Sequence, residues 1–237
     1  MTPRHLQRVL VTTGLHSGLG NAKDLITRLD RARNSSLVVG SGDFFEGSGS
    51  HRLGDSGVEH RTLTEVYDVI APGNHGWHHH LEPGLHALTV CANVSDTAGK
   101  PLFRRLLLTT IGGRRVAVTA VVDVPAVSAR QRTGQQVTDP VQALRRLLLE
   151  HHHGTDSWIV LSPGGLAESL RLAEACPFLD VIFTGPCHGE QHEPVRVGET
   201  LVLKGRESGL GYATATPCDS GWTAQLPPQH EPIQPGR

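Results

Sequence analysis

The chain has 237 residues, of which 38% are hydrophobic and 19% charged. This composition supplies enough apolar side chains for a core and excludes wholesale disorder. The 22 Lys and Arg side chains nearly balance the 23 Asp and Glu side chains, which argues against partners such as nucleic acid polymers or anionic membrane surfaces. No apolar run approaches the ~20 residues that span a bilayer, and no signal peptide is visible, so we expect a cytoplasmic protein.

Short β-branched runs alternate with amphipathic segments along the chain, the pattern of an α/β domain. We expect helices over 21–34, 59–67 and 166–175, and another that begins with Asp139 as N-cap and Pro140 at the first position. We expect strands over 8–13, 36–40, 68–73, 88–94, 157–162, 179–185, 199–205 and 209–217, and a hairpin over 104–124 that turns at Gly112–Gly113. The prediction is a single domain over 1–225 and a disordered Pro-rich tail over 226–237.

Polar side chains follow several predicted strands at the point where each strand ends. His16 and Asp43 lie in the first two of these loops, Asn74 and His75 in the third, and His188 in the last. In α/β domains, functional groups gather beyond the carboxyl ends of the strands. Imidazole, carboxylate and amide oxygen together suit a divalent metal such as zinc, manganese or iron. The sequence therefore predicts a metal site built from these loops.

The loops resemble those of the calcineurin-like metallophosphoesterase superfamily, most of all the catalytic domain of 5′-nucleotidases. That family carries Asp-x-His, Gly-Asp, Gly-Asn-His-Glu-Phe-Asp, a lone His at a strand end, and Gly-His-x-His. Gly42–Asp43 and Gly73–Asn74–His75 match, and the segment after the third loop is similar, so that the resemblance covers roughly residues 8–216. It implies a four-layer αββα sandwich of two mixed sheets, a two-metal site at one edge, and phosphoester hydrolysis.

The chain departs from the family pattern at several ligand positions. Gly14 stands where the family has the Asp of the first loop, and Pro163 and Pro186 stand where it has two metal-binding histidines. Gly76 and His78 replace the Glu and the Asp of the third loop. In the family that Asp orients the catalytic His, which corresponds to His75 in this chain.

The losses fall mainly on one of the two metals. By the resemblance, the first metal keeps His16, Asp43 and His188, and the second keeps only Asp43 and Asn74. Proline offers no ligating side chain, so the sequence predicts one divalent metal per chain: Fe, Mn or Zn. The sequence leaves open whether His78, His79, His80 or Cys187 replaces a lost ligand.

Three functions are compatible with these residues. The first is a metal-dependent hydrolase of a small phosphorylated metabolite or nucleotide, in which His75 protonates the leaving group and Asn74 holds the phosphate. The second is a repurposed scaffold with a mononuclear two-His-one-carboxylate site, for example iron with non-hydrolytic chemistry. The third is a non-catalytic descendant that binds a ligand or a partner. The sequence leaves substrate and oligomeric state open.

Other conspicuous residues have ordinary structural interpretations. The arginine pairs 104–105, 114–115 and 145–146 and the histidine run 151–153 are expected on solvated faces. The four cysteines show no zinc-finger spacing and are expected to be buried thiols. Phe44, Phe45 and Trp77 are the aromatic residues of the site loops, and Trp77 either stacks on a base or braces its loop.

Overall fold

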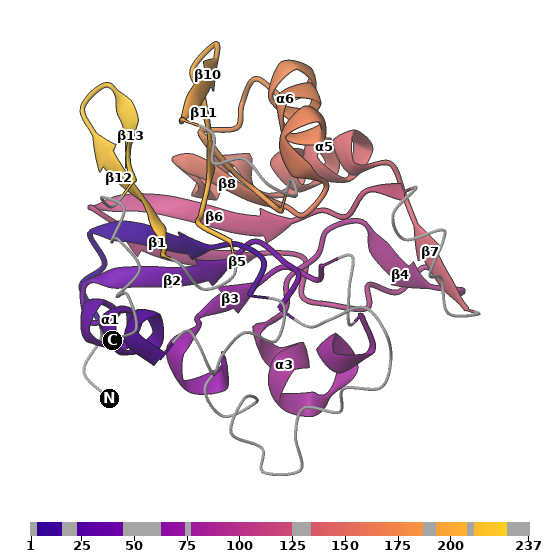
Figure 1. Cartoon of the computed structure of the whole chain (residues 1–237). Helices are drawn as coiled ribbons and strands as arrows, with labels where there is room; N and C mark the ends of the chain where they lie inside the picture. The colour runs from indigo at the N-terminus through magenta and orange to yellow at the C-terminus, as the bar shows by residue number, and fades with distance from the viewer. Residues whose placement is uncertain are drawn as a thin grey trace.

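The structure is a computed structural model that describes residues 4–15, 23–44, 63–73, 77–124, 134–186, 193–207 and 211–226. Two mixed β-sheets lie face to face, and helices cover their outer faces (Figure 1). Within the described ranges, no helix combines the length and the apolar character that crossing a bilayer requires.

The first sheet has the strand order β13-β12-β1-β2-β3. Its strands are β1 (Arg8–Thr12), β2 (Ser36–Gly40), β3 (Val69–Ile70), β12 (Ala213–Cys218) and β13 (Gly221–Gln225). The first three run parallel to one another, whereas β12 pairs antiparallel with both β1 and β13. The parallel strands therefore end at the same edge of this sheet.

The second sheet has the strand order β10-β11-β9-β8-β6-β5. Its strands are β5 (Leu107–Ile111), β6 (Arg114–Ala120), β8 (Ser157–Ser162), β9 (Val181–Thr184), β10 (Val195–Val197) and β11 (Thr200–Lys204). The four central strands are parallel, and the two edge strands are antiparallel. A separate antiparallel ribbon pairs β4 (Val94–Asp96) with β7 (Gln135–Val137).

The helices form the two outer layers. Figure 1 shows α1 (Lys23–Ala32) and α3 (Pro83–Leu88) beside the first sheet, and α5 (Pro140–His151) and α6 (Gly165–Ala175) beside the second. The 3₁₀ helices are η2 (Trp77–Leu81) and η3 (His152–Gly154), and residues 63–66 are helical. The αββα sandwich of two mixed sheets that the sequence predicted is confirmed.

Alternating side chains of the strands build the layers. In β1, Val9 and Val11 are buried in the core between the sheets, whereas Leu10 joins the cluster that contains Leu25 and Leu29 of α1. The same alternation in the second sheet feeds the inter-sheet core on one side and the α5–α6 layer on the other. Because both faces of each central strand are buried, these strands read in the sequence as continuous apolar runs.

Most predicted strands are confirmed, but the strand expected over 88–94 is wrong. Thr89 and Val90 form only single bridges, to Ile70 and Arg104, and β4 starts later. At Asn93 the side-chain amide, rather than the backbone, bonds to both backbone groups of Val122, so the pairing there is not that of a strand. β7, β10 and β13 were not predicted. Of the helix expected over 59–67, residues 59–62 lie outside the described residues, as do residues 227–237 of the tail.

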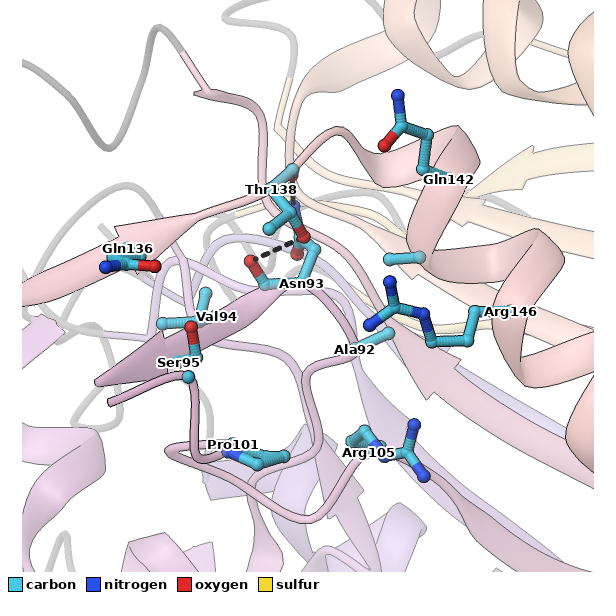
Figure 2. A pocket seen from close by; sticks show the side chains of 12 residues that line it. Ala92, Asn93, Val94, Ser95, Pro101, Arg105, Gln136, Thr138, Gln142 and Arg146 are labelled. Carbon is cyan, nitrogen blue, oxygen red and sulfur yellow. Dashed lines mark hydrogen bonds between the residues drawn. The ribbon is translucent and has the colours of Figure 1, made fainter. Parts of the chain in front are cut away.

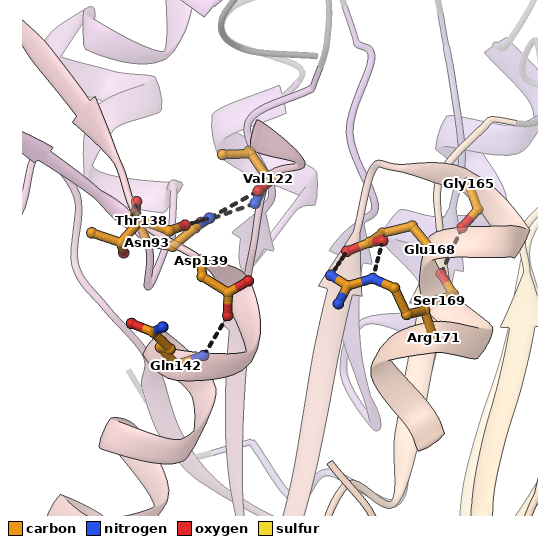
Figure 3. Close-up of polar contacts among 9 residues, drawn as sticks. All are labelled: Asn93, Val122, Thr138, Asp139, Gln142, Gly165, Glu168, Ser169 and Arg171. Carbon is orange, nitrogen blue, oxygen red and sulfur yellow. Dashed lines mark hydrogen bonds and ion pairs between the residues drawn. The ribbon is translucent and has the colours of Figure 1, made fainter. Parts of the chain in front are cut away.

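The predicted start of α5 is confirmed. The Asp139 side chain accepts a hydrogen bond of 2.9 Å from the backbone N of Gln142, and Pro140 occupies the first helical position (Figure 3).

We expect Asp139→Ala to lower the free energy of unfolding by about 1 kcal/mol, because one backbone donor loses its cap. Urea denaturation measures this change. Asp139→Asn is the control and should be nearly neutral, since Asn caps as well as Asp. Equal losses of stability for the two variants would show that the negative charge of Asp139, rather than its hydrogen bond to Gln142, stabilises the start of α5.

Candidate functional site

The ends of strands from both sheets meet at one place. A Cβ atom added to Gly42, after β2, would lie 3.1 Å from the Cα of Gly73, after β3, and 3.0 Å from Cγ of Pro163, after β8. A Cβ on Gly185, after β9, would lie 2.5 Å from the Cα of Pro163. The loops that follow β2, β3, β8 and β9 therefore lie against one another, and we call this place the strand-end site.

Asp43 lies at the centre of the strand-end site. It is 1% exposed, and its backbone has a φ of 53°, the left-handed region that Asp tolerates better than most residues. A Cβ on Gly73 would meet the backbone N and Oδ1 of Asp43 and would lie 2.7 Å from its Cα. Only glycine therefore fits at position 73. A buried carboxylate held in an uncommon backbone conformation is typical of functional sites.

Hydroxyl groups tie the two sheets together next to Asp43. The hydroxyls of Thr13 and Ser41 lie 2.9 Å apart, and Ser41 donates to the carbonyl of Thr184 at 3.1 Å. Thr13 Oγ1 accepts from the backbone N of Gly205 at 3.0 Å. These bonds join β1 and β2 of one sheet to β9 and β11 of the other, so they fix the position of the loops. These hydroxyl residues were not predicted from the sequence.

Of the predicted ligands and catalytic residues, only Asp43 lies within the described ranges, whereas His16, Asn74, His75 and His188 lie outside them. Of the candidate replacement ligands, Cys187 and the side chain of His78 also lie outside the described residues, while His79 and His80 are described.

Each of the four loops that carry these residues nevertheless starts at the strand-end site. Gly14, two residues before His16, donates its backbone N–H to the carbonyl of Gly42 at 3.2 Å, and Gly73 and Gly185 contact Asp43 and Pro163. The ligand set stays a prediction, and the origins of all four loops are compatible with it.

The residues present do not fit a second metal of the family type. Pro163 and Pro186, which stand at the two missing histidine positions, are both buried. The backbone of Pro163 is packed against Gly185, where even a Cβ would be too close. Within the described part of the chain, no three His, Cys, Asp or Glu side chains gather in a metal-binding group. The donor types of His16, Asp43 and His188 do fit one divalent metal.

Two histidines after the third loop are buried and oriented by their Nδ1 atoms. His79 Nδ1 lies 2.8 Å from Oε1 of Glu82, and His80 Nδ1 lies 3.0 Å from Oγ1 of Thr89. Because the Thr89 hydroxyl donates to the carbonyl of Leu85, it accepts from His80, whose Nδ1 therefore carries the hydrogen. A replacement metal ligand at either position would have to use Nε2.

Two acidic side chains that the sequence analysis missed flank the Pro163 loop. A Cβ on Gly164 would lie 3.4 Å from Cβ of Asp123 and 3.0 Å from Cγ of Glu168. Burial, together with the nearby Glu168, raises the pKa of Asp123 above its usual value. Arg171 binds both oxygens of Glu168, at 2.7 and 2.8 Å (Figure 3). The sequence signal that could have identified Asp123 is its position directly after the long apolar run of the hairpin.

Phe44 belongs to the core rather than to a substrate platform. Its ring is 3% exposed and makes an edge-on contact with Tyr67 at 5.1 Å between centroids. It also lies directly over Gly40, where a Cβ would collide with the ring. Phe44 therefore offers no face to a base, while the side chains of Phe45 and Trp77 lie outside the described residues.

Comparison with known proteins gives a likeness at the level of structure. No known family profile matches the chain, and no curated protein does. The sulfate thiohydrolase SoxB of Thermus thermophilus superposes with a TM-score of 0.70 at 21% identity, over 90% of this chain and 42% of that one. The NAD nucleotidase NadN of Haemophilus influenzae gives 0.72 at 16% identity, over 93% and 49%.

A third solved structure matches nearly along its whole length. The calcineurin-like phosphoesterase YfkN of Bacillus subtilis gives a TM-score of 0.67 at 17% identity, over 93% of this chain and 88% of that one. The chain thus spans less than half of SoxB and of the NAD nucleotidase. These likenesses, together with the two mixed sheets and their outer helices, show that the chain has the fold of the calcineurin-like metallophosphoesterases.

Proposed function

We propose that the chain is a metal-dependent hydrolase that cleaves the phosphoester of a small metabolite or nucleotide with a single metal. The observation that carries the proposal is Asp43, a buried carboxylate in left-handed backbone where the loops of both sheets touch. The fold and the similarity to a nucleotidase and to a phosphoesterase support the reaction class.

The chain offers one donor set for a metal, which lacks only the Asp that Gly14 replaces in the first loop. His16, Asp43 and His188 would hold it, with the side-chain oxygen of Asn74 as a further ligand. When bound, a divalent ion of this kind lowers the pKa of a coordinated water to about 7 and polarises a phosphoryl oxygen. Asp43 contributes the one negative charge of the set, and Gly73 allows its carboxylate to lie against the neighbouring loop.

The remaining steps belong to side chains of the third loop. His75 donates a proton to the leaving oxygen, and the Asn74 amide holds the phosphate in place. His78 stands where the family has the Asp that orients this histidine. We therefore expect a lower rate than in a two-metal enzyme, which clamps both the attacking and the leaving oxygen.

His75→Asn should lower kcat about 100-fold on an alkyl phosphate such as glycerol phosphate and leave the metal content unchanged. On p-nitrophenyl phosphate the loss should be smaller, because that leaving group departs without protonation. The exposed His153→Asn variant is the control. Unchanged rates for His75→Asn would move the proton donor to the run His78–His80.

Metal analysis combined with activity tests the proposal as a whole. The purified protein should contain close to one Zn, Mn or Fe per chain, and nucleoside monophosphates or sugar phosphates should be hydrolysed only by the metal-loaded form. Absence of turnover across such a panel with each of the three metals would contradict the hydrolase. Two tightly held metals would show that replacement ligands exist.

The buried Pro163 and Pro186 also favour a second candidate, the mononuclear enzyme with non-hydrolytic chemistry. A two-His-one-carboxylate set with open positions is shared with non-haem iron(II) oxygenases. Iron as the purified metal, oxygen consumption with an organic substrate and no phosphate release would support this candidate over the hydrolase.

A further inference from the structure

A cavity with polar groups in its lining lies away from the residues of the strand-end site. It has a volume of about 230 Å³ and is lined by the ribbon β4–β7, the segment between β4 and β5 and the first turns of α5 (Figure 2). None of the glycines and prolines that bring the catalytic loops together lines it. The cavity therefore offers a binding site that is separate from the proposed catalytic one.

Asn93 makes the floor of this cavity rigid. The side chain is 2% exposed, and its Nδ2 donates to the carbonyls of Val122 at 2.8 Å and Thr138 at 2.9 Å. Its Oδ1 accepts from the backbone N of Val122 at 3.0 Å. One amide thus ties the ribbon to the end of β6 and to the segment that enters α5. The polar groups above it are held on a fixed frame, which lowers the entropic cost of binding.

Two guanidinium groups line one side of the cavity. Arg105 precedes β5 and binds both carboxylate oxygens of Glu150, at 3.1 and 2.5 Å. Arg146 projects from α5, and within the described residues it makes no hydrogen bond or ion pair. Arg105 holds the pKa of Glu150 below its usual value, so this carboxylate is ionised at neutral pH. Arg146 also attracts Glu150 electrostatically, without an ion pair. The two arginines and this one carboxylate together leave one net positive charge at the cavity.

Neutral hydrogen-bonding groups complete the lining. The side chains of Ser95 and Gln142 face the same space, from β4 and from the first turn of α5 (Figure 2). No aromatic ring is among the described residues that line the cavity, so none of these residues can stack on a nucleotide base. A net positive charge with hydroxyl and amide groups around it is the chemistry that recognises an oxyanion.

We propose that this cavity binds the phosphate or carboxylate group of a small metabolite, with Arg146 as the main ligand-binding residue and Arg105 as the second. The arginine pairs 104–105 and 145–146 read as solvated faces in the sequence, because the two pairs are far apart along the chain. The fold brings one member of each pair to the same cavity.

Isothermal titration at low, constant ionic strength tests the proposal with two probes, inorganic phosphate and malonate. The probe that binds in a saturable manner identifies the oxyanion. Arg146→Gln should weaken its binding at least about tenfold, because a charged hydrogen-bond donor is lost. Ala143→Leu should do the same without any change of charge, since Ala143 lines the cavity and the larger side chain fills it.

Arg145→Gln is the matched control for these variants. Arg145 lies on the same turn of α5, but its guanidinium donates to the carbonyl of Ala175 and does not line the cavity. This variant should keep the affinity of the wild-type protein. Phosphate bound at the strand-end site should respond to none of the three substitutions.

Three results would overturn the proposal. The first is that neither probe binds the wild-type protein in a saturable manner. The second is that Arg146→Gln and Ala143→Leu bind as tightly as the wild type. The third is that Arg145→Gln weakens binding as much as Arg146→Gln, which would show that the loss of affinity comes from the general surface charge and not from the cavity.

Discussion

Asp43→Asn should remove the metal and abolish hydrolysis while the fold stays intact. The substitution keeps the shape of a side chain that is confined by Gly73, and Asn tolerates left-handed backbone as well as Asp does. It removes the only negative charge of the predicted ligand set. We expect metal content to fall from about one per chain to a small fraction of that, with turnover below detection.

Stability measurements distinguish this effect from unfolding. Removing a buried charge that has no metal to balance it should leave the metal-free protein at least as stable as the wild type. The wild type should gain about 2.7 kcal/mol of stability from metal at a free metal concentration 100 times Kd. Asp43→Asn should lose this gain. Thermal melts with and without a chelator measure both quantities.

Asp68→Asn is the matched control because Asp68, directly before β3, is another aspartate beside a strand of the first sheet but serves the fold. Its carboxylate binds Arg4 at 2.7 Å and Arg33 at 3.3 Å and accepts from the backbone N of Val38. This variant should lose stability and keep its metal, the opposite of Asp43→Asn. If Asp43→Asn retained full metal content and activity, the proposed site would be wrong.

The central strands were predictable from the sequence because they are buried on both faces, whereas their division into two packed sheets came from the resemblance to the family. The stretches VLV of β1 and WIVL of β8 are apolar without interruption and are followed by loops with glycine, so both the type and the limits of these strands are visible. The start of α5 was visible because Asp139 and Pro140 act through local backbone geometry. Edge strands such as β10 carry no such signal, since their burial is partial.

The sequence predicted the parts of the candidate site that lie within one short loop, but not the contacts between loops. Gly73 and Asp43 each belong to a short loop motif, but their contact joins two loops and is invisible along the chain. The same holds for the bonds of Thr13 and Ser41 to the second sheet. Arg105 and Arg146 look like surface charges for the same reason, because they come to one cavity only when α5 lies beside β4 and the segment before β5.

The contact between Gly73 and Asp43 leads to the second large expected effect. Gly73→Ala should destabilise the protein by about 3 kcal/mol or more, and it should also weaken metal binding. The added Cβ would meet the backbone N and Oδ1 of Asp43 and lie 2.7 Å from its Cα. A clash with backbone cannot be relieved by a side-chain rotation, so the loop after β2 or the loop after β3 has to move.

Gly154→Ala separates this clash from the general effect of replacing glycine. A Cβ at position 154 would have nothing within 4 Å, so we expect a change within about 0.5 kcal/mol. Urea denaturation of both variants, with the metal removed and with it restored, gives the intrinsic stability and the metal-linked part separately. If the two variants were equally stable and bound metal equally, the loops after β2 and β3 would not be in contact. We expect Gly73→Ala to lose both stability in the metal-free state and affinity for the metal. One contact would then account for both losses, because the added Cβ displaces atoms of Asp43, the residue that we propose carries the charge of the site.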